Sequence, residues 1–133
     1  MNFVDQLCGA RPATLSIELR LCVEAARREA AARGASPLSQ SYCALVLLRG
    51  QPSTSLSLPH RSAPVHRDEL IAEILKRLPA VTQDVPREAP PIQVHSDLAV
   101  LMMKYGSIGD QATLLDLFLC NPDHVLTDAL AKL

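Results

Sequence analysis

The clearest feature of the chain is the helical spacing of apolar residues in two segments. Segment 12–34, PATLSIELRLCVEAARREAAARG, carries apolar residues on one face of a helix and ends in a glycine, a typical stop signal. Segment 67–79, RDELIAEILKRLP, starts with acidic residues and ends with basic residues and a proline, as the helix dipole favours. We expect two helices whose core-facing residues are Leu15, Leu19, Cys22, Ala26, Ala30, Leu70, Ile74 and Leu78.

Segment 36–50, SPLSQSYCALVLLRG, has helix boundary signals in the correct order. Ser36 is placed as the N-cap and Pro37 as the first helical residue, while Arg49 falls in the last turn and Gly50 just after it. The apolar run at 42–49 is also compatible with a strand. We therefore expect a helix, with a short hairpin within 42–58 as the alternative.

The C-terminal part predicts three short helices in succession. Their sequences are HSDLAVLMMKYG, DQATLLDLFLC and NPDHVLTDALAKL, and the expected N-caps are Ser96, Asp110 and Asn121. Pro/Ser-rich connections occupy residues 51–66 and 79–94. The fold class expected for residues 1–133 is all-α, a single compact domain of six or seven short helices.

Two glycines in KYGSIGDQ lie just before one of these helices. A phosphate-binding loop would need a lysine followed by serine or threonine after its second glycine, whereas Asp110 would repel a phosphate here. A DNA-reading helix pair has a similar turn, but the helix that follows offers no arginine or lysine to grip DNA. We interpret the segment as a corner in which Gly106 is a left-handed C-terminal cap, Gly109 relaxes the turn and Asp110 caps the next helix.

Candidate catalytic and metal-binding residues are few. The tripeptide His66-Arg67-Asp68 occurs in kinase catalytic loops, but the chain is too short for a kinase and the tripeptide reads as a helix N-terminus. Cys120 and His124 could share a metal, yet no second pair has metal-site spacing. We expect no enzyme activity, no metal and no cofactor, with a small Cys/His enzyme as an alternative.

Composition and charge restrict the partners. The net charge of -1 and the pI of about 6.4 make nucleic acid an unlikely partner, and no apolar run is long enough to span a membrane. The N-terminus has no secretory signal pattern, so we expect a cytoplasmic protein with reduced cysteines; the excess of arginine over lysine is typical of GC-rich bacterial genes. The arginines Arg27, Arg28 and Arg33 are expected on a solvated helix face.

The functional hypothesis of a protein-binding surface depends on the amount of apolar helix surface in the chain. The runs CALVLL, LAVLMM and LLDLFL have almost no polar side, and a domain of this size normally encloses about one such helix. A monomeric core rich in leucine and alanine is the alternative. We expect part of this surface to bind another protein or a second copy of the chain, through Leu98, Leu101, Met102, Met103, Leu114, Leu117 and Phe118.

The functional prediction is therefore a cytosolic helical interaction module that acts through apolar helix faces. An adaptor, a secretion-type chaperone or an inhibitor would all fit this description. A small DNA-associated transcriptional or mobile-element regulator is the first alternative, and the Cys/His enzyme is the second.

Overall fold

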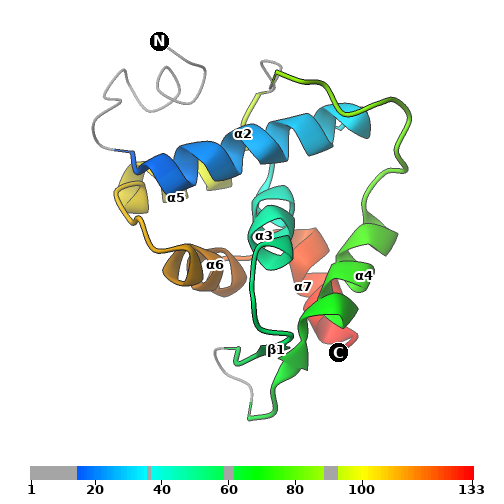
Figure 1. Ribbon diagram of the computed structural model, residues 1–133, viewed down its shortest axis with the longest axis vertical. Coiled ribbons are helices and arrows are strands. Elements are labelled where there is room, and N and C mark those ends of the chain that lie inside the picture. The colour runs from blue at the N-terminus through cyan, green and yellow to red at the C-terminus, as the bar shows by residue number, and fades with distance from the viewer. Residues whose placement is uncertain (1–14, 36, 59–61, 89–92) are drawn as a thin grey trace.

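The computed structural model of the chain describes residues 15–35, 37–58, 62–88 and 93–133 (Figure 1). Within these ranges the fold is all-α apart from one two-stranded ribbon, as the sequence predicts. The elements are α2 (Ile17–Ala32), α3 (Gln40–Arg49), β1 (Ser55–Leu56), β2 (Val65–His66), α4 (Arg67–Arg77), α5 (Ser96–Tyr105), α6 (Gln111–Cys120) and α7 (His124–Ala131).

Helix α2 begins after Ser16, which was not among the predicted caps, and ends at Gly34 as expected. The hydroxyl of Ser16 accepts a hydrogen bond from the Leu19 amide at 3.0 Å, which caps the first turn. At the other end Gly34 takes a φ of 63°, and the Ala35 amide donates to the Ala30 carbonyl at 2.9 Å. This is the left-handed glycine stop expected from the sequence.

Helix α3 is the centre of the fold, and in Figure 1 it is seen nearly end-on between the other helices. It packs against α2, α6, α4 and α7, and its apolar residues are buried on nearly every side. The expected start of this helix was wrong: the chain is extended at Ser39, and the helix begins at Gln40. Ser36 lies outside the described residues. Pro37 precedes the helix because Leu38 forms a parallel bridge with Val94, which holds the chain extended.

The connection 51–66 contains the short ribbon. Strands β1 and β2 pair antiparallel with Leu56 opposite Val65, so the hairpin lies later in the chain than the 42–58 alternative placed it. The strand alternative for residues 42–49 was wrong, because they are helical. His66 then caps α4: its Nδ1 atom accepts the Asp68 amide at 3.2 Å, as a helix N-terminus requires.

Two of the three C-terminal helices start at caps other than those expected. Helix α5 is capped by His95, whose Nδ1 accepts the Asp97 amide, and α7 is capped by Asp123. Ser96 is the first helical residue instead, and Asn121 ends α6. Asp110 caps α6 as predicted, because its carboxylate accepts the Thr113 amide at 3.1 Å.

The connection 79–94 ties the two halves of the chain together. The Thr82 amide donates to the carbonyl of Ala32, the last residue of α2, at 2.8 Å. Near the other end, the His95 amide donates to the Leu38 carbonyl at 2.7 Å. Buried apolar residues of all six helices in the described ranges form one cluster.

Candidate functional surfaces and cavity

The structure places most of the predicted partner-binding residues in the core. Five of its seven residues are buried in the core and cannot meet a partner in this conformation: Leu98, Leu101, Met102, Leu114 and Phe118. Leu117 is partly buried, and Met103 is 69% exposed. The physical reason is that α5 and α6 each bury one face in the core around the central helix α3. Their other faces remain accessible, and on α5 that face is itself apolar, because Val100 is 47% exposed beside Met103.

Large apolar side chains are nevertheless exposed on α2. Ile17 is 71% exposed and Leu21 is 60% exposed, and their spacing of one helical turn puts them on the same face. They border a groove of about 430 Å³ between α2 and α3, whose lining includes Val46 and Leu47. Neither residue was among the predicted partner-binding residues, although both are apolar and lie beside the core-facing stripe in the sequence.

The glycine corner connects the start of α2 to the end of α5. The Ser16 amide donates to the Gly106 carbonyl at 2.7 Å. Gly106 has a φ of -65°, so the prediction of a left-handed cap was wrong. Glycine is required there for space: a Cβ atom would collide with the Met102 carbonyl oxygen and with the Leu15 Cδ2 atom. The corner is therefore a packing contact between helices.

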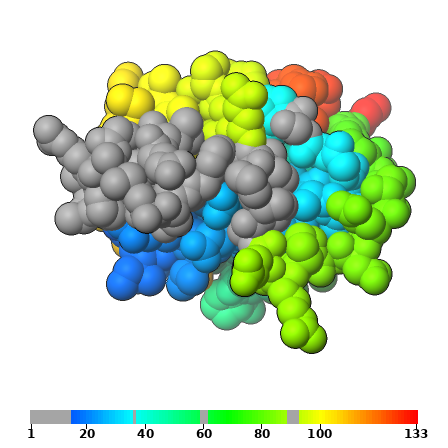
Figure 2. Space-filling model, turned by 90° about the horizontal axis from the view of Figure 1, so that it is seen from above, coloured from blue at the N-terminus to red at the C-terminus, as the bar shows by residue number. Residues whose placement is uncertain are grey.

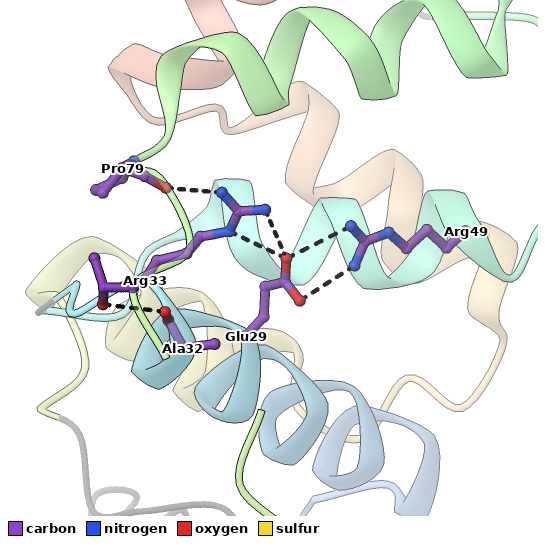
Figure 3. Close-up of polar contacts among 6 residues, drawn as sticks. Glu29, Ala32, Arg33, Arg49 and Pro79 are labelled. Atoms are coloured by element: carbon purple, nitrogen blue, oxygen red, sulfur yellow. Dashed lines mark hydrogen bonds and ion pairs between the residues drawn. The ribbon is translucent and has the colours of Figure 1, made fainter. Parts of the chain in front are cut away.

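The arginines of α2 are less solvated than expected. Arg27 is buried, and Arg33 forms an ion pair with Glu29 at 3.1 Å while donating to the Pro79 carbonyl at 2.7 Å. Figure 3 shows the Glu29 carboxylate between the guanidinium groups of Arg33 and Arg49. This network joins α2, α3 and the connection after α4, so its role is structural.

A cavity of about 720 Å³ lies where three helices begin. Its lining includes residues from the first turns of α3, α5 and α7, together with the ends of α2 and α4. Figure 2 shows the cyan start of α3 between the yellow-green residues that lead into α5 and the orange-red start of α7. Residues of four helices, α3, α4, α5 and α7, and of the connections next to them therefore line one space. Its polar lining residues are Ser39, Ser41, Tyr42, Arg77, His95, Asp97, Asp123 and His124.

Tyr42 is the unusual residue of this cavity. Its side chain is 3% exposed, and its hydroxyl has no hydrogen-bond partner among the described residues. Burial raises the pKa of the Tyr42 phenol above its ordinary value of 10.0, with a smaller opposing effect from Arg33. The hydroxyl therefore stays protonated at neutral pH. The sequence contained no signal for this residue beyond its place in an apolar helix.

The cysteines and histidines were the candidate metal ligands and catalytic groups of the sequence. No group of three metal-ligating residues is found in the described part of the chain. Cys22 and Cys43 are buried neighbours. The pKa of the Cys43 thiol is raised well above its ordinary value, mainly by its hydrogen bond with Cys22 and also by burial. Cys120 is exposed and does not line the cavity, whereas His124 does.

Helix α6 lacks the cationic side chains that the hypothesis of a DNA-recognition helix requires. Helix Gln111–Cys120 contains no arginine or lysine, and it packs against α3. A recognition helix normally supplies such cations to phosphates and guanine.

Comparison of the chain with protein families, with curated proteins and with solved structures found no match. None of the helices that the structure describes has both the length and the apolar character that crossing a membrane requires.

Proposed function

We propose that the chain is a helical protein-binding module whose contact surface is the groove beside α2. The observation that carries this proposal is the exposure of Ile17 and Leu21 at the border of an apolar groove. A single exposed apolar side chain is common on protein surfaces. Two neighbouring exposed apolar side chains beside a groove are typical of binding surfaces. Complete burial of both by a partner would contribute roughly 2–4 kcal/mol, because each is already partly buried.

The expected partner presents an apolar helix face, either from another protein or from a second copy of this chain. Ile17 and Leu21 are four residues apart, so they match side chains with the same spacing on a docked helix. Glu18 and Gln111 also line the groove and could fix the orientation of the partner through polar contacts.

The experiment compares two substitutions that make the same kind of change on two helices. Leu21→Glu puts a charge into the groove, and Met103→Glu puts one on the exposed face of α5. We expect Leu21→Glu to abolish association in sedimentation velocity at micromolar concentration, because the partner would bury the charge. Met103→Glu should associate like the unchanged protein, and both variants should keep the full helical circular dichroism signal.

A photo-crosslinking amino acid at position 21 or 103 tests partners other than the chain itself. An adduct that forms only from position 21 supports the groove, whether the captured chain is a second copy or another protein. An adduct that forms only from position 103 would move the surface to α5. If neither position gives an adduct and the chain sediments as a monomer, the interaction proposal fails.

A further inference from the structure

The groove beside α2 has an acidic end. Among the described residues that line it, Glu18 is the only charged one. Glu18 is three residues before Leu21, so its carboxylate lies beside this exposed apolar side chain on the helix surface. The Glu18 side chain is partly exposed, and within the described part of the chain it forms no ion pair. A docked partner therefore meets a carboxylate next to the apolar contact.

A second carboxylate lies at the same end, where α6 begins. Gln111, the first residue of α6, lines the groove, and Asp110 precedes it as the helix cap. The Glu18 carboxylate reaches this corner, because its Oε2 atom would be 3.2 Å from a Cβ atom placed on Gly109. Hydrogen bonds from Thr113 lower the pKa of the Asp110 carboxyl, so this group is ionised at neutral pH. The starts of α2 and α6 offset part of both charges, but neither start supplies a cationic side chain to this corner.

The basic residues of the helices that form the groove do not balance its acidic end. Arg20 is two residues from Glu18, which places it about 200° around α2 and away from that carboxylate. Arg28 is ten residues from Glu18, about 15 Å along the helix axis. Arg49 of α3 is paired with Glu29, and α6 contains neither arginine nor lysine. The charge at this end of the groove is therefore negative.

The acidic end makes a symmetric dimer through the groove unfavourable. In a two-fold dimer the same surface patch of each copy meets itself. If Ile17 and Leu21 of one copy packed on the same pair of the other, the two-fold axis would pass near residue 19. Each Glu18 would then lie close to its own copy, and like charges brought together in this way oppose association. A partner with a basic residue at this position is attracted instead.

We propose that the occupant of the groove is an amphipathic helix of another protein, with a lysine or arginine at the end that meets Glu18 and Asp110. This inference rests on the proposed function and narrows its two kinds of partner to one. Apolar side chains four residues apart on the docked helix contact Ile17 and Leu21, and the basic residue lies one turn beyond them. The ion pair forms at the rim of the contact, where charge mainly sets the orientation of the partner and the rate of encounter.

The probes are three peptides of about 18 residues, long enough to form a helix, that share one stripe of leucines. They differ only in the residue one turn beyond the stripe, which is lysine, glutamine or glutamate. Fluorescence anisotropy of the labelled peptides measures their binding to the full chain. We expect the lysine peptide to bind about threefold more tightly than the glutamine peptide, as one rim ion pair allows, and the glutamate peptide to bind more weakly than both. High salt should remove these differences, because charges at the rim are screened.

Glu18→Gln removes the charge and keeps the shape of the side chain, and Glu69→Gln makes the same change at an exposed position of α4. Glu18→Gln should bring the lysine peptide to the affinity of the glutamine peptide, whereas Glu69→Gln should bind all three peptides like the unchanged protein. Equal affinity for the lysine and glutamine peptides, with both weakened by Leu21→Ala, would overturn the basic partner and leave the groove as a binding surface. Self-association of the chain through position 21 would have the same meaning. If no peptide binds in a way that depends on Leu21, the docked helix itself is refuted.

Discussion

Replacement of Gly106 by alanine is a small chemical change that we expect to have a large effect on stability. Gly106 has an ordinary φ of -65°, so an alanine there causes no left-handed backbone strain. The added Cβ atom would instead collide with the Met102 carbonyl oxygen and the Leu15 Cδ2 atom. The carbonyl belongs to the backbone and cannot rotate away, and Leu15 is itself buried. The corner between α5 and α2 must therefore shift.

The expected magnitude is the difference between opposing effects. Alanine in place of glycine at a compatible backbone position stabilises by about 0.4–1 kcal/mol, because the unfolded chain loses freedom. Overpacking in a filled core costs about 1–3 kcal/mol. A shift of the corner would also stretch the 2.7 Å hydrogen bond from the Ser16 amide to the Gly106 carbonyl, which costs about 1 kcal/mol more. We expect a net loss of about 1–3 kcal/mol in the free energy of unfolding.

Urea denaturation followed by circular dichroism measures this loss, with Gly50→Ala as the matched control. The nearest atoms to a Cβ at Gly50 are backbone oxygens at 3.7 and 3.8 Å, which is ordinary contact. Gly109→Ala is a second control, because its Cβ would meet only the flexible carboxylate of Glu18 at 3.2 Å and a more distant serine carbon. Both controls should be nearly neutral. If Gly106→Ala unfolds at the same urea concentration as Gly50→Ala, the steric argument is refuted.

Three further predictions concern the core, the ion-pair network and a cap. Leu19 is 2% exposed, so Leu19→Ala should cost about 2–5 kcal/mol in a urea melt, and a loss below about 0.5 kcal/mol would contradict its burial. Arg33→Ala should lower the free energy of unfolding by about 1–3 kcal/mol in the same urea melt, because Arg33 also donates to the Pro79 carbonyl. Arg49→Ala should lower it by only about 0–1 kcal/mol, because Arg49 is more exposed and makes only the ion pair with Glu29. Hydrogen bonds from Thr113 lower the pKa of the Asp110 carboxyl below its ordinary value of 3.8 in the folded protein. The stabilisation from this ionised carboxylate is therefore complete above pH 3.8 and is lost as the pH falls through the lower folded pKa. Asp110→Asn should remove this pH dependence when the free energy of unfolding is measured in an acid titration.

The sequence by itself determined the helices that have strong local signals. The stripes of α2 and α4 face the core as expected, since residues three and four apart in a helix always share a face. Helices also begin at Ser16 and Asp110, whose side chains accept backbone amides of their own first turn. Helix α2 ends at Gly34, which takes the left-handed backbone conformation. These outcomes depend on neighbours in sequence only.

Other boundaries depended on contacts across the fold. The start of α3 moved to Gln40 because Leu38 pairs with Val94, a residue far along the chain. Asp123 rather than Asn121 begins α7, and its carboxylate also accepts the Ser41 amide of α3. A choice between possible caps is decided by such tertiary partners, which local patterns do not contain.

The tertiary structure alone decided which apolar surface is exposed. Composition and periodicity showed that α3, α5 and α6 are apolar, and the three runs together suggested more apolar surface than one small domain encloses. Packing around α3 buries Leu98, Met102 and Phe118, while Ile17 and Leu21 stay exposed on α2. The same packing brings Tyr42, His95 and His124 from three helices to one cavity. Burial depends on the arrangement of all helices together, so a sequence pattern gives the apolar faces but not the neighbours that cover them.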